Sequence, residues 1–249
     1  MHGMIARNDL ALGPLYKRVK MLLTESLAAG EWKPNQAIPS ETRLAQQFDV
    51  SIGTVRKAID ELVAEKILIR QQGRGTFVAA HSQDRFLYHF FHIVGVDGVK
   101  RFPTTELLSF SKERGDAEMT QRLNLPRNSR VIRICNLLRI EGEPVEVDEI
   151  YISAAAFPDL TREVFEQRTG TIYQLYQDRY GINVIHTTER LRAGAASAED
   201  AALLTLAEGA PVLEIERTAF TYSDAPIELR KSRINTTRHV YLNDLAKTP

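Results

Sequence analysis

The sequence predicts an α+β protein in two parts: a small, mainly helical N-terminal part and a larger C-terminal part built on an antiparallel sheet. Three observations support this. Between residues 14 and 64, apolar residues recur at helical spacing in three stretches. Between residues 131 and 235, two pairs of long apolar runs are each joined by a short turn sequence. The composition, 43% hydrophobic and 26% charged, is that of an ordinary globular protein.

Three helices are predicted in the N-terminal part. The first begins at Pro14, whose missing N–H has no helical partner in a first turn, and ends near Gly30. The second begins after Ser40 and the third after Ser51, because a serine hydroxyl there can accept from an unpaired backbone N–H. A tight turn at residues 49–50 joins these two helices.

A hairpin of two short strands follows the third helix. Its strands are predicted at residues 67–70 and 76–79, around a glycine-containing turn at residues 71–75. Two helices joined by a tight turn are the parts of a helix-turn-helix, which reads double-stranded DNA, and the hairpin would be its wing. We expect this domain to cover residues 9–79.

The start of the third helix and the hairpin turn carry the side chains that we expect to contact DNA. Arg56 is the main candidate, because a guanidinium can bond guanine bidentately, and Arg74 suits a narrow minor groove. Taken alone, Arg56 and Lys57 would be ordinary solvated charges, and the glycines around Arg74 only a turn. Their combination favours DNA. The predicted contacts are Ser40, Thr42, Arg43, Ser51, Gly53, Thr54, Arg56, Lys57, Gln72, Gly73, Arg74 and Gly75.

The charge distribution is consistent with a first part that reads DNA and a second part that does not. The formal net charge is zero, but residues 1–80 carry a small excess of basic residues and the remainder an equal excess of acidic ones. A mildly basic first part suits a DNA-reading domain.

The second domain is expected at residues 86–249, after a short polar linker at residues 80–85. Strand-rich segments interleaved with helices indicate an antiparallel sheet with helices packed on it. The expected strands are residues 86–94, 131–140, 145–152, 184–193, 212–222 and 227–235, and the expected helices are residues 160–166, 172–180 and, after Ser197 as its cap, 198–207.

Most of residues 14–79 follows one motif: Leu15-Tyr16, Gly30, Pro34, Pro39-Ser40-Glu41, Leu44-Ala45, Val50-Ser51, Thr54-Val55-Arg56, Ala58, Leu62, Gly73 and Gly75-Thr76-Phe77-Val78. On these residues the first part resembles the winged helix-turn-helix of the GntR family of bacterial regulators. Looser matches run from residue 106 to 244: Gly142-Glu143-Pro144-Val145, Tyr151-Ile152, Tyr173, Tyr180-Gly181, Ala202-Leu203-Leu204, Pro211-Val212-Leu213, Arg217 and Pro226-Ile227-Glu228. On these the second part is similar to the UTRA effector domain of the HutC subfamily.

The resemblance implies a transcriptional regulator, expected to be a repressor, with a chorismate-lyase-like second domain used for binding. It also implies a homodimer on a near-palindromic operator, and a metabolite that alters DNA binding. The chain departs from the family pattern at four positions. Thr42 and Ile52 stand where arginines are frequent, and Asn136 and Leu138 where relatives that sense sugar phosphates have arginines.

The resemblance also suggests effector contacts. Strand alternation places Glu228, Arg230 and Ser232 on one face. Arg139 and Arg230 would bind a carboxylate or phosphate bidentately, and the acids a hydroxyl or amine. Alternatively, these residues form cross-strand pairs at the surface. The predicted effector contacts are Arg139, Asp148, Tyr151, Glu228, Arg230 and Ser232.

Other classes of function are less well supported. The sequence lacks Gly-x-Ser-x-Gly, Walker and His-Glu-x-x-His motifs, so an enzyme acting on a small carboxylated metabolite is only an alternative, as is a DNA-binding protein without an effector. We expect no cofactor. No metal site is expected, because His89 and His92 would lie on opposite faces of a strand. Cys135, the single cysteine, is expected to be buried and inert. With no membrane span or signal core, the cytoplasm is the expected location.

Overall fold

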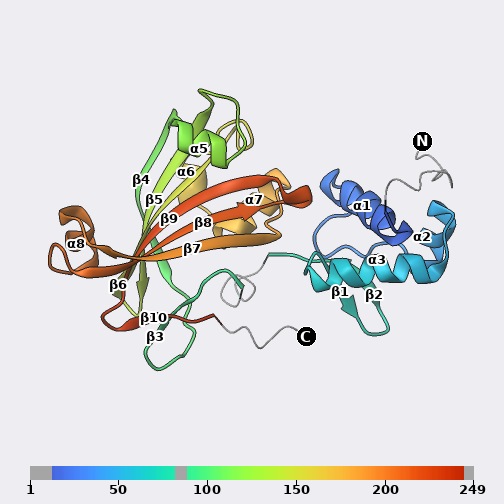
Figure 1. The fold of residues 1–249 in the computed structure, drawn as a ribbon, viewed down its shortest axis with the longest axis horizontal. Coiled ribbons are helices and arrows are strands. Elements are labelled where there is room, and N and C mark those ends of the chain that lie inside the picture. Colours follow the sequence, from blue (N-terminus) through green and yellow to red (C-terminus); the bar gives the residue numbers. More distant parts are fainter. Residues whose placement is uncertain (1–12, 82–88, 244–249) are drawn as a thin grey trace. The chain divides into compact units, whose positions relative to one another are not determined.

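The computed structural model describes residues 13–81 and 89–243. The chain divides into two compact units, Met1–Ala80 and His81–Pro249. Figure 1 shows the helices and hairpin of the first unit and the large sheet of the second. The α+β fold class predicted from the sequence is confirmed.

The first unit contains three helices and a hairpin. Ser40 and Ser51 cap the second and third helices through bonds from the backbone N–H groups of Arg43 and Thr54. Asp49 adopts a left-handed conformation between these helices, which makes the turn tight. Fully buried side chains such as those of Leu23, Leu44, Val55 and Leu62 hold the three helices together. The elements are α1 (Leu15–Ala28), α2 (Glu41–Phe48), α3 (Ile52–Ala64), β1 (Leu68–Gln71) and β2 (Gly75–Val78).

The hairpin is closed by a turn that needs glycine. The register pairs Leu68 with Val78 and Gln71 with Gly75. Gly73 and Gly75 have φ angles of +72° and +115°, which side chains with a Cβ rarely adopt. The two strands therefore meet in a narrow, exposed tip.

The second unit is built on a six-stranded antiparallel sheet with the strand order β4-β5-β6-β9-β8-β7. Two long hairpins, β5–β6 and β8–β9, form its centre; both hairpins were predicted from the sequence. The strands are β4 (Thr104–Arg114), β5 (Arg130–Ile140), β6 (Glu143–Ser153), β7 (His186–Ala195), β8 (Pro211–Phe220) and β9 (Pro226–Asn235).

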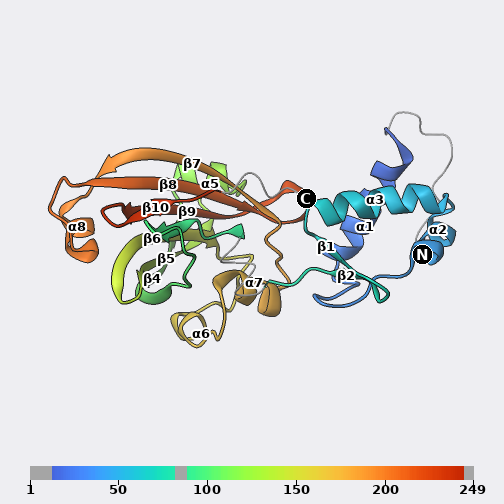
Figure 2. The ribbon, with the colours of Figure 1, turned by 90° about the horizontal axis from the view of Figure 1, so that it is seen from below.

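Helices cover both faces of this sheet. Helices α6 (Arg162–Glu166) and α7 (Ile172–Tyr180) lie on one face, over the largest apolar core of the unit (Figure 2). Helices α5 (Ala117–Arg122) and α8 (Ala198–Leu204) pack on the other face through two smaller apolar clusters. We call the face under α6 and α7 the inner face.

The structure differs from the expectations at the start of this unit. The predicted strand 86–94 is wrong over residues 89–92, which are not extended strand; strand β3 covers only Ile93–Gly95 and pairs with β10 (His239–Tyr241). Residues 82–88, which include most of the predicted linker, lie outside the described residues. Strand β4 and helix α5 were not predicted. Strand β4 is an edge strand without a clear alternation of buried and exposed residues.

Candidate nucleic-acid interface and ligand cavity

The predicted DNA-contact residues of the first unit gather at three exposed places. These are the start of α2, the start of α3 and the tip of the hairpin. Arg56 and Lys57 leave α3 on the side opposite its buried residues Val55, Ala58 and Ile59. All twelve predicted residues are exposed except Thr54, which is half-buried.

Glu41, at the start of α2, pairs with one arginine of α3 and one of β1. Its Oε2 accepts from Arg56 Nε at 2.8 Å, and its Oε1 accepts from Arg70 Nη2 at 3.2 Å. Arg70 also pairs with Asp60, Nη1 to Oδ1 2.5 Å. The Arg56 side chain is 59% exposed, so the pair is worth no more than about 1 kcal/mol. Glu41 therefore orients Arg56 without removing it from solvent.

The hairpin tip and α2 border a groove of about 520 Å³. Arg70 and Arg74 line it, together with Ser40 at the start of α2. Arg74 lies 5.8 Å from the Phe77 ring, and Lys57 Nζ lies 4.1 Å from the Tyr16 ring. Exposed cations beside a helix start are the groups that bind a phosphate backbone.

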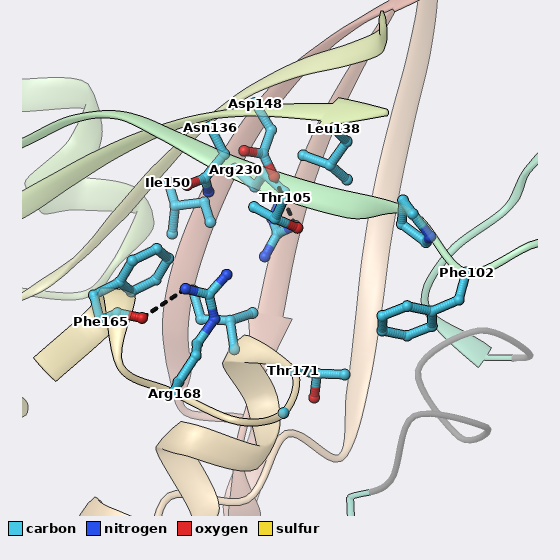
Figure 3. Close-up of a pocket in the computed structure, with 13 residues that line it drawn as sticks. Phe102, Thr105, Asn136, Leu138, Asp148, Ile150, Phe165, Arg168, Thr171 and Arg230 are labelled. Atoms are coloured by element: carbon cyan, nitrogen blue, oxygen red, sulfur yellow. Dashed lines mark hydrogen bonds and ion pairs between the residues drawn. The ribbon is translucent and has the colours of Figure 1, made fainter. Parts of the chain in front are cut away.

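The second unit contains a cavity between the inner face of the sheet and the start of α7 (Figure 3). Strands β5, β6 and β9 contribute Asn136, Asp148 and Arg230, and the segment before α7 contributes Arg168 and Thr171. Its volume of about 60 Å³ is small beside the roughly 300–1,000 Å³ of ordinary ligand pockets. Apolar side chains complete the wall: Phe102, Pro103, Leu138, Ile150, Phe165 and Ile172.

A buried ionic network forms the sheet side of this cavity. Arg230 donates from Nη1 to Asp148 Oδ2 at 2.9 Å and from Nε to Glu228 Oε1 at 3.0 Å. Glu228 also accepts from the hydroxyls of Tyr173 at 3.1 Å and Tyr176 at 2.8 Å, both on α7. Burial lowers the pKa of Arg230, but Glu228 and Asp148 outweigh it and raise the pKa well above its ordinary value. Arg230 is therefore a permanent charge at this site.

Four buried polar atoms of the cavity lining have no hydrogen-bond partner among the described residues. They are Asn136 Oδ1, Asp148 Oδ1, Arg168 Nε and Arg230 Nη2. Arg168 is held in place by Phe165, whose carbonyl accepts from its Nη1 at 2.6 Å and whose ring lies 3.9 Å from the guanidinium. Unpaired buried donors and acceptors are costly, so this wall suits a polar ligand.

The carboxyls of the inner face respond to their burial. Burial, together with the charge of Asp148, raises the pKa of Glu146 to about 7. Burial also raises the pKa of Asp148, although Arg230 and Asn136 oppose the change. Burial therefore favours the neutral, protonated form of both carboxyls.

The structure brings together some of the predicted effector residues and separates others. Asp148 and Arg230 line the cavity, and Glu228 lies directly behind Arg230. The register puts Glu228, Arg230 and Ser232 on the inner face, as strand alternation predicted, and Ser232 bonds Glu146. Tyr151 lies on the opposite face, where its hydroxyl donates to Glu149 at 2.6 Å.

Arg139 also lies outside the cavity lining. Its Nη2 donates to Glu106 at 3.4 Å near the end of the β5–β6 hairpin. Sequence reasoning missed Arg168. The only available signal was an arginine shortly before the capping residue Thr171, whose side chain accepts from Gln174 N at 3.1 Å. Among the described residues, no group of three or more His, Cys, Asp or Glu could hold a metal, and no described helix is long and apolar enough to cross a membrane.

Comparisons with known proteins match both parts of the chain to known families. The model of the gntR family of bacterial regulatory proteins matches residues 15–78, and the UTRA domain model matches residues 99–240. A protein of Escherichia coli K12 named "Probable fructoselysine utilization operon transcriptional repressor" is 32% identical over 229 residues, covering 90% of this chain and 93% of its own. The histidine utilization repressor of Pseudomonas putida is 27% identical, covering 88% and 87%.

Solved structures show the same fold. The ligand-binding domain of a Bordetella bronchiseptica protein assigned to the GntR-family regulators has a TM-score of 0.60 at 28% identity, covering 64% of this chain and 98% of its own. PhnF of Mycobacterium smegmatis has a TM-score of 0.53 at 21% identity, covering 92% and 99%. The chain belongs to the GntR family of bacterial regulatory proteins and is a DNA-binding transcriptional regulator with a UTRA effector domain.

Proposed function

We propose that this regulator is a cytoplasmic repressor that binds a near-palindromic operator as a homodimer. A small metabolite bound in the cavity of the second unit would change its affinity for DNA. The observation that carries the proposal is the exposed array of Arg56, Lys57 and Arg74 around a capped helix start. Names of relatives that include fructoselysine and histidine utilization repressors support repression by a metabolite-responsive protein.

DNA contact would use the three exposed places in different ways. The start of α3 would enter the major groove, with Arg56 bonding a guanine or a phosphate and Thr54 a phosphate or a thymine methyl. The hairpin tip would reach the minor groove through Arg74. Glu41 would hold Arg56 in a defined direction until DNA competes for it.

The effector would bind at the cavity of the second unit, where Asp148, Arg168 and Arg230 present unpaired polar atoms. A carboxylate or phosphate would bond the arginines. The cavity offers no arrangement of nucleophile and base that favours catalysis, and members of the family are regulators. Binding without turnover is therefore the proposed role.

The DNA-contact assignment is tested by titrating the full chain with a near-palindromic operator selected from random duplexes. We expect Arg56→Ala to lose at least tenfold in affinity, about 1.4 kcal/mol, because it removes a charge-assisted contact. Two salt concentrations are compared, because one lost phosphate contact lowers the slope of log affinity against log salt by about one.

Two further variants complete this test. Arg162→Ala, which breaks the exposed pair with Glu166 on α6, should bind DNA like the wild type. Glu41→Gln keeps Arg56 and removes its carboxylate partner, so it should bind at least as tightly as the wild type. Equal affinities of Arg56→Ala and wild type would refute the role of Arg56. No preference of wild type for any duplex over random competitor would refute the proposed function itself.

A further inference from the structure

The cavity wall specifies more than a generally polar ligand. Its four unpaired atoms divide into two acceptors, Asn136 Oδ1 and Asp148 Oδ1, and two donors, Arg168 Nε and Arg230 Nη2. A phosphate is all acceptor when fully ionised, so it would satisfy only the donors. A group that presents a donor and an acceptor side by side would satisfy both pairs.

The side chains behind these atoms are deeply buried. Asp148 is 1% exposed, Asn136 2% and Arg230 4%. Asp148 and Asn136 are direct cross-strand neighbours on β6 and β5, so their side chains leave the inner face together. Figure 3 shows Arg168 approaching the same space from the opposite wall. The acceptors thus lie on the sheet, and one donor faces them across the cavity.

The charge balance distinguishes between ligands. Asp148 and Glu228 share the charge of Arg230, and Glu189 pairs with Arg217, Oε1 to guanidinium 2.6 Å. Glu146 is buried in the same face, where burial favours its neutral form. An amino-carboxylate zwitterion adds no net charge to this face, whereas a phosphate dianion would place two negative charges beside Asp148.

The available space fits one end of a metabolite. A cavity of about 60 Å³ takes a compact polar head group, and the apolar side chains of Phe102, Leu138 and Ile150 offer a surface to a carbon chain. The rest of a longer ligand would displace Arg168 or extend past Phe102, which lies apart from the polar end in Figure 3.

We propose that the effector carries an ammonium and a carboxylate on the same carbon atom, as an α-amino acid does, with the ammonium at Asp148 and Asn136 and the carboxylate at Arg168 and Arg230. This rests on the proposed function of the cavity as the effector site. Arg168 is then a residue that determines specificity, because it is the basic residue that the α6–α7 connection adds to the cavity lining.

The test measures ligand binding to the full chain by thermal unfolding, without DNA. The probes are the twenty free L-amino acids and fructoselysine, and they are compared with glucose 6-phosphate and inorganic phosphate. Each is used at about 10 mM, which nearly saturates a site with a dissociation constant of about 1 mM. We expect at least one amino-carboxylate to raise the melting temperature and both phosphates to leave it unchanged. For L-lysine, cadaverine lacks the α-carboxylate and 6-aminohexanoate lacks the α-ammonium; if lysine binds, neither should.

Two variants place the ligand in the cavity. Arg168→Gln should weaken binding of the stabilising probe at least tenfold by calorimetry, while its unliganded melting temperature stays close to that of wild type. Arg162→Gln, on exposed α6, is the matched control and should bind like wild type. The proposal is overturned if no amino-carboxylate binds, if a phosphate stabilises more strongly, or if Arg168→Gln binds unchanged. None of these results affects the DNA titration, which decides the DNA-binding part of the proposed function.

Discussion

Two carboxyls on one strand show how strongly the two faces of the sheet differ. Glu146, on the inner face, is fully desolvated, and its pKa is raised to about 7. Glu149 is on the opposite face. Burial raises its pKa, but hydrogen bonds from Tyr151 and Arg233 outweigh this and lower the pKa to about 2. Both residues are glutamates on the same strand, so their different pKa values could not be predicted without knowing which side chains surround each of them.

Glu146 should make the stability of the second unit depend on pH. In the unfolded chain its carboxyl ionises near its ordinary pKa of 4.5, whereas in the fold it stays protonated until about pH 7. The folded state therefore binds the extra proton, and the free energy of unfolding falls as pH rises from about 4.5 to 7. At roughly 1.4 kcal/mol per unit of pKa, the loss is on the order of 3 kcal/mol.

The measurement is urea unfolding of the full chain at pH 5 and pH 8, for wild type and Glu146→Gln. The variant cannot ionise at this position, so it should lose less stability between the two pH values. Identical pH dependence in both proteins would show that Glu146 ionises normally in the fold.

At the scale of elements, the sequence predicted the helix caps and turns, which depend on residues close together in the chain. The serine caps of α2 and α3 and the glycine turn of the hairpin follow from backbone bonding, and the structure has them where expected. The central hairpins are long, largely buried apolar runs joined by short turns, and were also predicted. Edge strand β4 and the short strands β3 and β10 depend on pairing between distant segments, which a single sequence does not reveal.

Removing the cap of α3 tests whether the Ser51 hydroxyl stabilises the first unit. Ser51→Ala deletes the hydroxyl that accepts from Thr54 N at 3.1 Å and contacts Thr54 Oγ1 at 2.9 Å. We expect the first unit to lose about 1 kcal/mol of unfolding free energy. Circular dichroism during thermal unfolding measures it, with Ser111→Ala, on the exposed edge strand β4, as a control that should change little. An unchanged melting curve for Ser51→Ala would mean that the cap contributes nothing.

The DNA-contact residues could be predicted more completely than the cavity lining, because they lie closer together in the sequence. The DNA-contact residues follow one another along α2, α3 and the hairpin, so their grouping is visible in the sequence. The cavity instead combines residues from three strands and a connection. Asp148 and Arg230 were predicted, whereas Arg168 reaches the cavity only because α6 and α7 fold back over the sheet.

At the scale of the whole molecule, the proposed homodimer makes a prediction about DNA length. Two copies would read two half-sites about one helical turn, roughly 34–36 Å, or a multiple of it apart. A duplex with both half-sites should bind the full chain much more tightly than one with a single half-site, and inserting five base pairs between them should abolish the difference. Electrophoretic mobility with purified protein measures both. Equal binding of one and two half-sites would contradict a dimer that reads both.

The single buried thiol has a practical consequence for studying such an assembly. Burial and nearby carboxylates raise the pKa of Cys135 to about 11, so at neutral pH only on the order of one molecule in ten thousand is a thiolate. Maleimide dyes should therefore leave the natural chain almost unlabelled. A cysteine introduced at the exposed hairpin tip would take up the dye selectively, and the distance between dyes on two copies could be followed by energy transfer as ligand is added.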